Sequence, residues 1–590
     1  MKTAHHSALV FGLIVTFVLS FGVFLRTFRL SQSPPSPYWE EVALGYDAYS
    51  LLKTGKDHHG VSWPILAAES FGDWKPTGYL YALLPSLALL GLETAAVRLP
   101  AVVSGIVIFC SAGYIAWKIT GKRISGLLGL AVAAVSPWGI QFSRAGWEVT
   151  LATGLFLVAT IVQTDVLSAK PTKKNKWILV GSGVLLWLSA YTYHAFRLLV
   201  PIWLFLIGLV MVAKFFGKKR KLTLLQRLVN ATKSSFTVLW PLVLVSLLAI
   251  LPFAQALGSS QLNQRFAETS IFSDSAIVEQ SNYWRQASGN TLLSRLVSHR
   301  FILFGKEMAQ SYFSHFDPVF LFFRGDENLR HSSGYGGQLY VIDAFTIIAG
   351  VQFLFTHKSK LSKPWVLLLF GLLFLSPIPA SLTKATPHAL RTLPLSVGFN
   401  VLSALGLTHL IYYCYEYGRV SFLEKKLSFK SVFLTMIPVL IVGVIYALQA
   451  TAWASHYFYV YPVLSAHEWQ FGYQEMVNTV ATLHQKDPNL PVYITREYGR
   501  PAMYYWFYTQ TSPNLVQEAN ATAKKDQGEF LTFENFVFIR GLYEIKQRPS
   551  IVALSPSDWE KLQPNVKDGS EPVIIKDLES KPIWIVASIE

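Results

Sequence analysis

The chain has 590 residues, of which 52% are hydrophobic and 15% are charged, and its mean hydropathy is +0.35. This balance excludes an ordinary soluble globular protein and indicates a polytopic membrane protein. The formal net charge of +16 does not by itself indicate a nucleic-acid partner, because membrane proteins collect basic residues in short loops that fix their orientation. The two cysteines, Cys110 and Cys414, lie far apart in or beside apolar runs, which argues against a disulfide framework or a thiolate metal site.

The first apolar run extends from about Ala8 to Leu25 after a weakly basic start. A secretory signal peptide would end in a small-x-small cleavage pattern. No such pattern follows this run cleanly, and Arg26 and Arg29 come next. We therefore expect a retained first membrane helix rather than a cleaved signal peptide.

Further apolar runs approach or exceed the roughly 18 residues that suggest a membrane-spanning helix. The stretch 77–91 is also apolar, but it is short and begins beside a proline, so we expect a helix near the membrane interface. The predicted fold class is a polytopic α-helical membrane protein with about 11 transmembrane helices and a C-terminal α/β domain outside the membrane. The candidate spans are residues 7–27, 95–117, 125–142, 149–168, 177–192, 197–213, 236–256, 337–356, 364–380, 390–413 and 431–453.

Basic residues are distributed unevenly over the connections between these spans. Every second connection is short and strongly basic, which is typical of loops on the cytoplasmic side. The pattern predicts a multi-pass protein of the plasma (inner) membrane with a cytoplasmic amino terminus and a carboxyl terminus outside. The basic connections contain Lys118, Lys122, Arg123 and the segments 170–176, 214–221, 357–363 and 419–430.

Two regions outside the spans are large. We expect a transmembrane domain over residues 1–456, with a first external loop at 28–94 and a large external loop at 257–336. An extracytoplasmic α/β domain is expected at 457–590, because predicted strands and helices alternate there. The predicted strands are PVYIT, NFVFIRG, PVIIKDL and PIWIVAS, and the predicted helices are YQEMVNTVATLHQK, RPAMYYWFYTQ and SPSDWEKL.

The stretch YWEEVALGYDAYSLLKTG, residues 38–55, places the adjacent carboxylates Glu40 and Glu41 shortly after the first span, and Asp47 follows. Adjacent acids at a membrane interface repel each other and are partly desolvated, which is costly. Such a pair can serve as a general base whose pKa is set by the second acid and by nearby arginines. The alternative is a solvated helix start, where the helix dipole stabilises acids.

Charged and histidine side chains recur on the same predicted side of the membrane as the paired acids. Taken singly, each basic residue there is commonly an interfacial anchor whose charge reaches water. Taken together, basic residues beside acids indicate one site for an anion held at the membrane surface, because cationic side chains bind phosphate. The residues concerned are Asp73, Lys75, Arg98, Arg144, Glu148, His194, Arg197, Lys384, His388 and Arg391.

Several motifs follow the paired acids in a fixed order. They are YDAYSLLKTGKD, SFGDWKPTGYLY, AVRLP, SPWGIQFSRAGWE, YTYHAFRLLVP, DPVFLFFRGDENLRHSSGYGGQLY, PIPASLT and PHALRTLP. In this order the chain resembles the bacterial membrane glycosyltransferases of the C-type (GT-C) superfamily. These are the Rgt-like relatives of the protein O-mannosyltransferases and of the aminoarabinose transferase of lipid A. The resemblance covers residues 1 to about 475 and is most specific in the first 200.

The resemblance implies an inverting hexosyl- or pentosyltransferase that moves a sugar from a polyprenyl-phosphate donor to an acceptor on the external face. An acid of the first external loop would be the general base. Relatives usually have Asp-Glu where this chain has Glu40-Glu41, which leaves open which of the two acts, although Glu40 is favoured. The implied roles are catalytic for Glu40, Glu41 and Asp73, donor-phosphate binding for Lys75, Arg98, His194, Arg197, His388 and Arg391, and acid or acceptor contact for Asp47, Arg144 and Glu148.

The sequence leaves the sugar, the acceptor and any metal open. The acceptor could be a protein, a glycolipid or a cell-wall polymer. A divalent metal is possible, because Glu40, Glu41, Asp73 and Glu148 could hold a hard cation and His194 or His388 could add a nitrogen ligand, but no ligand spacing is diagnostic. No GxGxxG or GxxxxGK[ST] motif is present, which agrees with a donor that is already anchored in the membrane.

Two other functions are alternatives to glycosyl transfer. A flippase or exporter of lipid-linked saccharides would place charged residues inside its spans and would show an internal repeat, and the sequence shows neither. A noncatalytic partner that presents an acceptor to another transferase would tolerate replacement of Glu40 and Glu41.

Overall fold

The structure is a computed structural model. It describes residues 2–169, 172–216, 223–259, 264, 267–423, 435–563, 565–567 and 571–590. Parts of the predicted basic connections, at 170–171, 217–221 and 424–430, therefore lie outside the described residues, as do 260–263 and 265–266 of the large loop and 431–434 of the last predicted span.

Contacts divide the chain into two compact units. The membrane unit contains residues 1–27, 103–143 and 148–454, and the paired-acid unit contains residues 28–102, 144–147 and 455–590. The sequence prediction groups the first loop with the transmembrane domain. In the structure, the contacts of this loop instead group it with the C-terminal domain.

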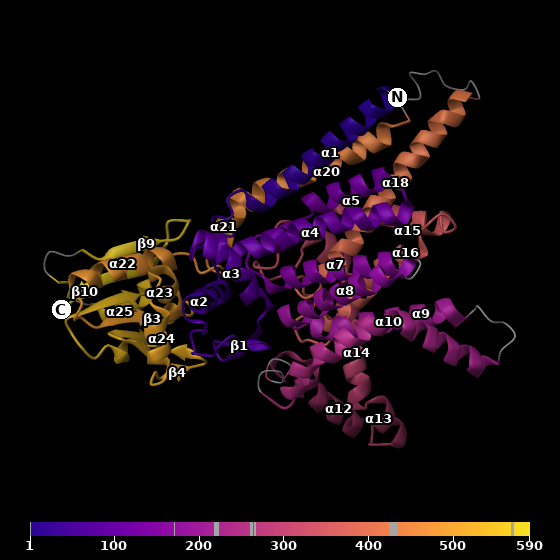
Figure 1. Cartoon of the computed structure of the whole chain (residues 1–590). Helices are drawn as coiled ribbons and strands as arrows, with labels where there is room; N and C mark the ends of the chain where they lie inside the picture. Colours follow the sequence, from indigo (N-terminus) through magenta and orange to yellow (C-terminus); the bar gives the residue numbers. More distant parts are fainter. Residues whose placement is uncertain are drawn as a thin grey trace. The chain divides into compact units, whose positions relative to one another are not determined.

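The membrane unit consists of helices and their connections (Figure 1). Long apolar runs adopt helices because a helix satisfies its own backbone hydrogen bonds in a medium without water. Its elements are α1 (Lys2–Thr27), α4 (Thr94–Thr120, whose start belongs to the paired-acid unit), α5 (Arg123–Val135), α6 (Pro137–Ser143), α7 (Glu148–Ser168), α8 (Lys173–Thr192), α9 (Phe196–Phe216), α10 (Leu224–Gln255), η1 (Ile271–Ser273), α12 (Ser275–Ala287), α13 (Leu292–Val297), α14 (Arg300–Ser314), η2 (Val319–Phe323), α15 (Val341–Thr356), α16 (Lys363–Leu375), α17 (Pro377–Ser381), α18 (Leu393–Leu423) and α20 (Ile437–Ser455).

Within the described residues, eight helices are long and apolar enough to cross a membrane, and α5 with α6 would make a ninth span. This pair is bent by 59°. The break falls at Ser136, whose extended backbone is expected before Pro137 because proline disfavours a helical preceding residue. The predicted class of polytopic helical membrane protein is confirmed, whereas the count of about 11 spans is not. The predicted spans 177–192 and 337–356 coincide with α8 and the shorter helix α15.

Glycines allow close packing between α15 and α18. A methyl group at Gly350 would collide with the Leu402 carbonyl, and one at Gly406 would collide with the Thr346 carbonyl. Small residues at such crossings let membrane helices approach closely, where van der Waals packing stabilises their association.

The paired-acid unit combines the first loop with the C-terminal α/β domain. From the first loop come α2 (Trp39–Thr54), β1 (Ala67–Ser70), β2 (Asp73–Pro76) and α3 (Gly78–Leu90), the helix predicted at 77–91. The C-terminal elements are η3 (His456–Val460), α21 (Tyr461–Leu464), α22 (Tyr473–Lys486), β3 (Val492–Thr495), α23 (Pro501–Thr509), α24 (Pro513–Asn520), β4 (Lys525–Asp526), β5 (Glu529–Phe530), β6 (Thr532–Phe533), β7 (Phe536–Ile539), η4 (Leu542–Glu544), β8 (Ser550–Leu554), α25 (Pro556–Leu562), β9 (Val573–Lys576) and β10 (Pro582–Ile589).

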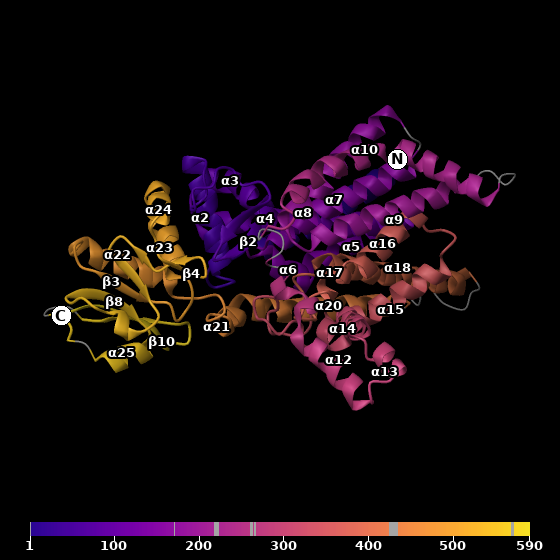
Figure 2. The ribbon, with the colours of Figure 1, turned by 90° about the horizontal axis from the view of Figure 1, so that it is seen from below.

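Among the described residues, six strands of the C-terminal domain form a mixed sheet in the order β6-β7-β3-β8-β10-β9, and β4 pairs with β5 separately. Strand β3 is parallel to β7 and β8, and β10 is antiparallel to β8 and β9. Figure 2 shows α22 and α25 on opposite sides of this sheet. The four predicted strands and three predicted helices coincide with elements of this domain. The sequence did not predict β8, whose five residues are all buried and give no alternation of polar and apolar side chains.

The first loop is fixed to the C-terminal domain by specific contacts. Helix α2 packs against α23, and the hydroxyl of Tyr504 donates to the Pro37 carbonyl at 2.9 Å. The backbone N–H of Trp39 donates to Gln470 Oε1 at 3.1 Å. At the tip of the β1–β2 hairpin, the backbone of Gly72 touches that of Gly528 so closely that a methyl group on Gly528 would collide with it. These contacts determine where the paired acids lie within the unit.

Candidate active site

The paired acids lie in the first turn of α2. The Tyr38 backbone N–H donates to Glu41 Oε2 at 3.0 Å, which is the return bond of a capping box. Gly55 ends the helix, because its left-handed backbone with φ 72° is easily adopted only by glycine. Local sequence therefore determines both ends of the helix that carries Glu40 and Glu41.

Glu41 is buried, and protein donors surround its carboxylate. Its Oε1 accepts from the Gly146 backbone N–H at 2.8 Å and from Arg98 Nε at 3.0 Å. Its Oε2 accepts from Tyr38, as above, and from Arg98 Nη2 at 3.2 Å. Only 4% of the side chain is exposed. A carboxylate held by a guanidinium and two backbone N–H groups organises the fold and is shielded from a substrate.

Arg98 is fully buried, and all five of its N–H groups donate within the unit. Besides its two bonds to Glu41, Nη1 donates to the carbonyls of Leu30 at 2.7 Å and Pro34 at 3.0 Å, and Nη2 donates to that of Ser36 at 2.7 Å. A guanidinium has five N–H donors, so in the described arrangement none is left for a phosphate. The structure therefore gives Arg98 a positioning role, and its contact with the donor phosphate remains a prediction.

Arg144 holds the same loop from another position. Its Nε and Nη2 donate to the Ser33 carbonyl at 3.1 and 2.8 Å, and Nη2 also donates to the Phe28 carbonyl at 2.6 Å. The Phe458 ring centre lies 4.8 Å from its guanidinium carbon, a favourable cation–π distance. Arg144 is fully buried and positions the loop, and its contact with an acid or acceptor remains a prediction.

Glu40, Lys75 and Asp73 form a second group, which solvent reaches. Lys75 Nζ lies 2.5 Å from Glu40 Oε1 and 3.8 Å from Asp73 Oδ2. The side chains of Glu40 and Asp73 are 27% and 21% exposed. Strands β1 and β2 pair as a hairpin, and Gly72, with φ 72°, permits its tight turn. The hairpin thus places one ammonium beside two accessible carboxylates.

The position of Lys75 bears on metal binding by the paired acids. A hard cation prefers several oxygen ligands, but the ammonium beside Glu40 and Asp73 already neutralises part of their charge and would repel a cation. Both oxygens of Glu41 are engaged by protein donors. The arrangement of Glu40, Asp73 and Lys75 is therefore better explained as an ion pair than as the metal site that the sequence left open.

Asp47 faces a buried cluster that sequence reasoning missed. Its Oδ1 accepts from the His58 backbone N–H at 3.1 Å and lies 2.5 Å from His58 Nδ1. Burial and the charge of Asp47 raise the pKa of Asp57 to about 6, and burial lowers the pKa of His59 to about 3. The consecutive residues Asp57, His58 and His59 were the sequence feature that could have indicated this cluster. Asp47 is 2% exposed and positions the loop after α2, and its acceptor contact remains a prediction.

The other predicted site residues belong to the membrane unit. Glu148 is buried at the N-terminus of α7, where a carboxylate is stabilised by the helix dipole. His194 lies between α8 and α9. Arg197, in the first turn of α9, has its guanidinium carbon 5.4 Å from the centre of the Phe253 ring. The proposed contacts of these residues with a donor remain predictions.

His388 lies beside two residues that sequence reasoning did not assign to the site. Asp326 Oδ2 is 3.4 Å from His331 Nδ1 and 3.9 Å from His388 Nδ1. Burial alone would raise the pKa of Asp326, but the hydrogen bonds from His331 and from backbone N–H groups outweigh it and lower this pKa. Farther along the same connection, Arg391 donates to Thr383 Oγ1. The sequence contained both histidine motifs but gave no reason to pair them.

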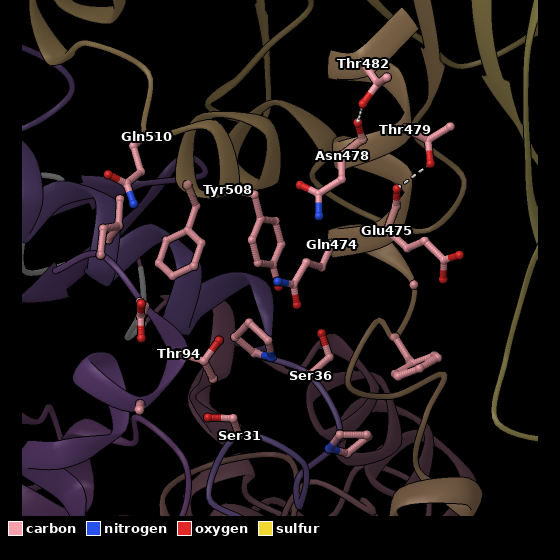
Figure 3. A pocket seen from close by; sticks show the side chains of 18 residues that line it. Ser31, Ser36, Thr94, Gln474, Glu475, Asn478, Thr479, Thr482, Tyr508 and Gln510 are labelled. Atoms are coloured by element: carbon pink, nitrogen blue, oxygen red, sulfur yellow. Dashed lines mark hydrogen bonds between the residues drawn. The ribbon is translucent and has the colours of Figure 1, made fainter. Parts of the chain in front are cut away.

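A pocket of about 820 Å³ lies within the paired-acid unit. Figure 3 shows that Ser36, Gln474 and Tyr508 point toward one another in it. The described residues that line it include Glu93 and Glu475 but no lysine or arginine. Most of its polar groups are hydroxyls and amides, contributed by Ser31, Ser36, Thr94, Gln474, Asn478, Thr479, Thr482, Tyr508 and Gln510.

No protein-family model and no curated protein sequence matches the chain. Among solved structures, the chain is similar to ArnT from Cupriavidus metallidurans bound to undecaprenyl phosphate, at 12% identity and a TM-score of 0.45, over 99% of this chain and 98% of that one. It is also similar to the archaeal oligosaccharyltransferase AglB from Archaeoglobus fulgidus in complex with an inhibitory peptide and a dolichol-phosphate. There the identity is 12% and the TM-score 0.47, over 84% of this chain and 63% of that one. Both neighbours are GT-C membrane glycosyltransferases, the group that the sequence motifs resemble. The side chains described above, rather than these distant likenesses, carry the functional proposal.

Proposed function

We propose that the chain is a membrane glycosyltransferase that moves a sugar from a polyprenyl-phosphate donor to an acceptor hydroxyl at the external membrane face, with inversion at the anomeric carbon. The observation that carries this proposal is the contrast between Glu40 and Glu41. The Glu41 carboxylate is enclosed by protein donors, whereas Glu40 is 27% exposed beside Lys75. A general base must be reached by the hydroxyl whose proton it takes, and Glu40 meets that requirement.

The proposed reaction is a single displacement. Glu40 takes the proton of the acceptor hydroxyl while the hydroxyl oxygen bonds to the anomeric carbon from the face opposite the phosphate. The bond from this carbon to the phosphate oxygen breaks, and its electron pair leaves with the lipid phosphate. Lys75 Nζ, 2.5 Å from Glu40 Oε1, pairs with the carboxylate and orients it toward the acceptor hydroxyl. Asp73 Oδ2 also lies 3.8 Å from Lys75 Nζ, and Asp73 is the second candidate base.

Arg98 and Arg144 contribute to this reaction indirectly. Together they bind the backbone carbonyls of Phe28, Leu30, Ser33, Pro34 and Ser36. This holds the loop that leads into α2 and so fixes the direction of the Glu40 side chain. Such preorganisation matters because a small misplacement of a catalytic group lowers the rate sharply.

The polar pocket supports a neutral, hydroxyl-rich acceptor such as a glycan or a glycolipid head group. Its hydroxyl and amide groups can donate to and accept from sugar hydroxyls, and the two glutamates that line it would disfavour a phosphate. Ser36 links the pocket to the paired acids, because it lines the pocket and its carbonyl accepts from Arg98. A protein acceptor is the alternative that the experiment below distinguishes.

The reaction requires the paired-acid unit to face the side of the membrane where the donor sugar is displayed. The basic connections support a plasma-membrane protein with its amino terminus in the cytoplasm and the C-terminal domain outside. Labelling of a cysteine introduced at Glu518, in the C-terminal domain, by a membrane-impermeant reagent in intact cells tests this orientation. Labelling only after the membrane is permeabilised would contradict it.

The proposed activity is tested by sugar transfer in membranes supplied with a panel of radiolabelled polyprenyl-phosphate sugars, with glycolipid, glycan and protein fractions analysed separately. Wild type is compared with Glu40→Gln and Asp73→Asn, and with Glu518→Gln as a control at an exposed acid of the same unit. Loss of transfer by about 10²-fold or more in Glu40→Gln supports Glu40 as the base.

The same assay separates the alternatives. Loss of transfer in Asp73→Asn but not in Glu40→Gln would move the base to Asp73. Wild-type transfer in both variants would contradict acid–base catalysis at this group and favour a noncatalytic protein that presents an acceptor. The labelled fraction identifies the acceptor class.

A further inference from the structure

One carboxylate and two imidazoles form a cluster in the membrane unit. Asp326 and His331 follow η2, and His388 precedes α18. The ligand atoms that these three side chains can offer all lie within 4.8 Å of one another, and the two imidazole ring centres are 4.7 Å apart. Two segments that are distant in the sequence therefore bring three metal-ligating side chains together.

We propose that Asp326, His331 and His388 bind a divalent transition-metal cation, with Zn²⁺ as the ion that this donor set fits best. Two imidazole nitrogens and one carboxylate oxygen are borderline donors that suit Zn²⁺ and leave one coordination position open. Zn²⁺ binds such donors at about 2.0–2.2 Å, so neighbouring donors of a tetrahedron lie about 3.3–3.6 Å apart. Of the distances from Asp326 Oδ2, 3.4 Å already lies in this range and 3.9 Å needs a small contraction, and the two imidazole donors, within 4.8 Å of each other, move closer as the cation binds.

The carboxylate ligand is already oriented. Asp326 Oδ1 accepts from the Asn328 backbone N–H at 3.0 Å, and Oδ2 accepts from the Ala389 backbone N–H at 2.8 Å. Because Ala389 follows His388 in the chain, the second bond also ties the two ligand segments together. Hydrogen bonds that orient a ligand raise the metal affinity of a site, so these bonds favour cation binding.

The histidine segments are held in place as well. Gln338 Nε2 donates to the His331 carbonyl at 3.3 Å. The His388 backbone N–H donates to His315 Nε2 at 3.1 Å, and His315 Nδ1 lies 2.8 Å from the Ser311 carbonyl oxygen. His315 thus uses both ring nitrogens to support the His388 segment instead of serving as a fourth ligand. The fourth position would be taken by water or an anionic oxygen.

An ion pair between Asp326 and one protonated histidine is the competing explanation. It accounts for the contact of 3.4 Å between Asp326 and His331. It does not require the second imidazole, whose ring centre lies 4.7 Å from that of the first and whose Nδ1 lies 3.9 Å from the same carboxylate oxygen. A divalent cation accounts for all three side chains at once.

A bound cation would strengthen the attachment of the large loop to the connection before α18. These segments already meet at the bridge between Ser270 and Thr383 and through the hydrogen bond from the Ile271 backbone N–H to the Leu382 carbonyl at 3.0 Å. A metal at the proposed site would add coordination bonds to these contacts. This role does not depend on the proposed glycosyl transfer, and metal binding is measured without any activity.

The test uses the full chain purified in detergent micelles and stripped of metal with a chelator. His5 and His6 are replaced by alanine in every sample, because a tandem histidine pair can bind Zn²⁺ by itself. We expect calorimetric titration with ZnCl₂ to give one Zn²⁺ per chain, Co²⁺ to give the visible absorption of a four-coordinate site, and Zn²⁺ to raise the unfolding midpoint.

Three variants each remove one ligand and keep its size: Asp326→Asn, His331→Gln and His388→Gln. Each should weaken Zn²⁺ binding by more than about 10-fold, the lower range seen even for groups that only orient a ligand, and should abolish the rise of the midpoint. His357→Gln is the matched control, since His357 faces His409 with ring centres 5.7 Å apart but is not part of the cluster. It should bind Zn²⁺ as the parent chain does.

The proposal is overturned if the parent chain binds neither Zn²⁺ nor Co²⁺ at one per chain, or if all three variants bind as tightly as the parent. Failure of a variant to fold does not decide the matter, because the comparison of the parent chain with and without metal stands on its own. Failure of glycosyl transfer in a chain that binds one Zn²⁺ would count against the proposed function and not against the metal site.

Discussion

Glu40 and Glu41 are neighbours in the sequence, yet their surroundings differ. Both oxygens of Glu41 accept from buried donors, and the side chain is 4% exposed. Glu40 has an ammonium at 2.5 Å and keeps 27% of its surface. The difference shows how a fold separates two identical side chains, using one carboxylate to build the site and leaving the other accessible to a substrate.

Replacing Arg98 should have the largest effect on stability, because it removes the cation that pairs with Glu41. Arg98→Met leaves the buried Glu41 carboxylate without its cation, and breaking a buried ion pair in this way costs about 3–5 kcal/mol. We expect a much lower unfolding midpoint of the purified protein and poor expression. Arg540→Met is the control, because Arg540 pairs with Asp526 at the surface and is 60% exposed. A wild-type midpoint in Arg98→Met would contradict the structural role.

Gly528→Ala should disturb the solvent-accessible group around Glu40 by displacing the hairpin that carries Asp73 and Lys75. The added methyl group collides with the backbone at Gly72, and overpacking of this kind costs about 1–3 kcal/mol. Hydrogen–deuterium exchange should rise over residues 67–76, and transfer should fall with it. Gly60→Ala separates the collision from backbone strain, because Gly60 also has positive φ but no atom within 4 Å of the added methyl. Equal effects of the two changes would refute the explanation.

Gln474→Ala tests whether the polar pocket supplies the acceptor to Glu40. Loss of one hydrogen bond to an acceptor should cost about 1 kcal/mol, which raises the KM for the acceptor several-fold. The KM for the lipid donor should stay unchanged, since the substitution is made in the pocket alone. Steady-state kinetics with each substrate varied in turn make this measurement. A change confined to the donor KM would assign the pocket to the donor.

The smallest effect on stability is expected from a substitution of Asp57, in the buried cluster that also contains Asp47 and His58. The pKa of Asp57 is raised from 3.8 to about 6, so its ionised form is disfavoured in the folded state. This cost is present above about pH 6 and is relieved as the pH falls toward 4. Asp57→Asn should therefore stabilise the protein by about 1 kcal/mol at pH 7.5. This is less than the roughly 3 kcal/mol that the pKa difference alone would give, because the amide loses the attraction to His58.

The measurement for this substitution is the unfolding midpoint of wild type and Asp57→Asn between pH 4.5 and 8. The gain should shrink steadily as the pH is lowered. A gain that is constant over this range, or that grows toward low pH, would show that ionisation of Asp57 is not its cause.

Much of the architecture could be predicted from the sequence because it depends on local patterns. Apolar runs predicted the membrane helices, and alternating segments predicted the C-terminal α/β domain. The short buried strand β8 was missed, since five buried residues look the same in a strand and in a buried helix. The number of spans was harder to predict, because α15 is short and α5 and α6 are separated by a bend of 59°.

The roles within the candidate site were less predictable, because they depend on contacts between distant segments. The sequence identified Glu40, Glu41 and Lys75 as a charged group. Arg98 lies 57 positions after Glu41. The sequence did not show that all N–H groups of Arg98 donate to that acid and to backbone carbonyls. The same limit applies to Asp326 and His388, which meet only through the fold.

The central claim is that Glu40 acts in sugar transfer while Glu41 acts in structure. The most direct test measures sugar transfer and the unfolding midpoint together for Glu40→Gln and Glu41→Gln. The account predicts that Glu40→Gln loses transfer by about 10²-fold or more with a nearly unchanged midpoint, and that Glu41→Gln lowers the midpoint strongly by leaving Arg98 buried without its anion. Full transfer by Glu40→Gln, or a stable but inactive Glu41→Gln protein, would contradict it.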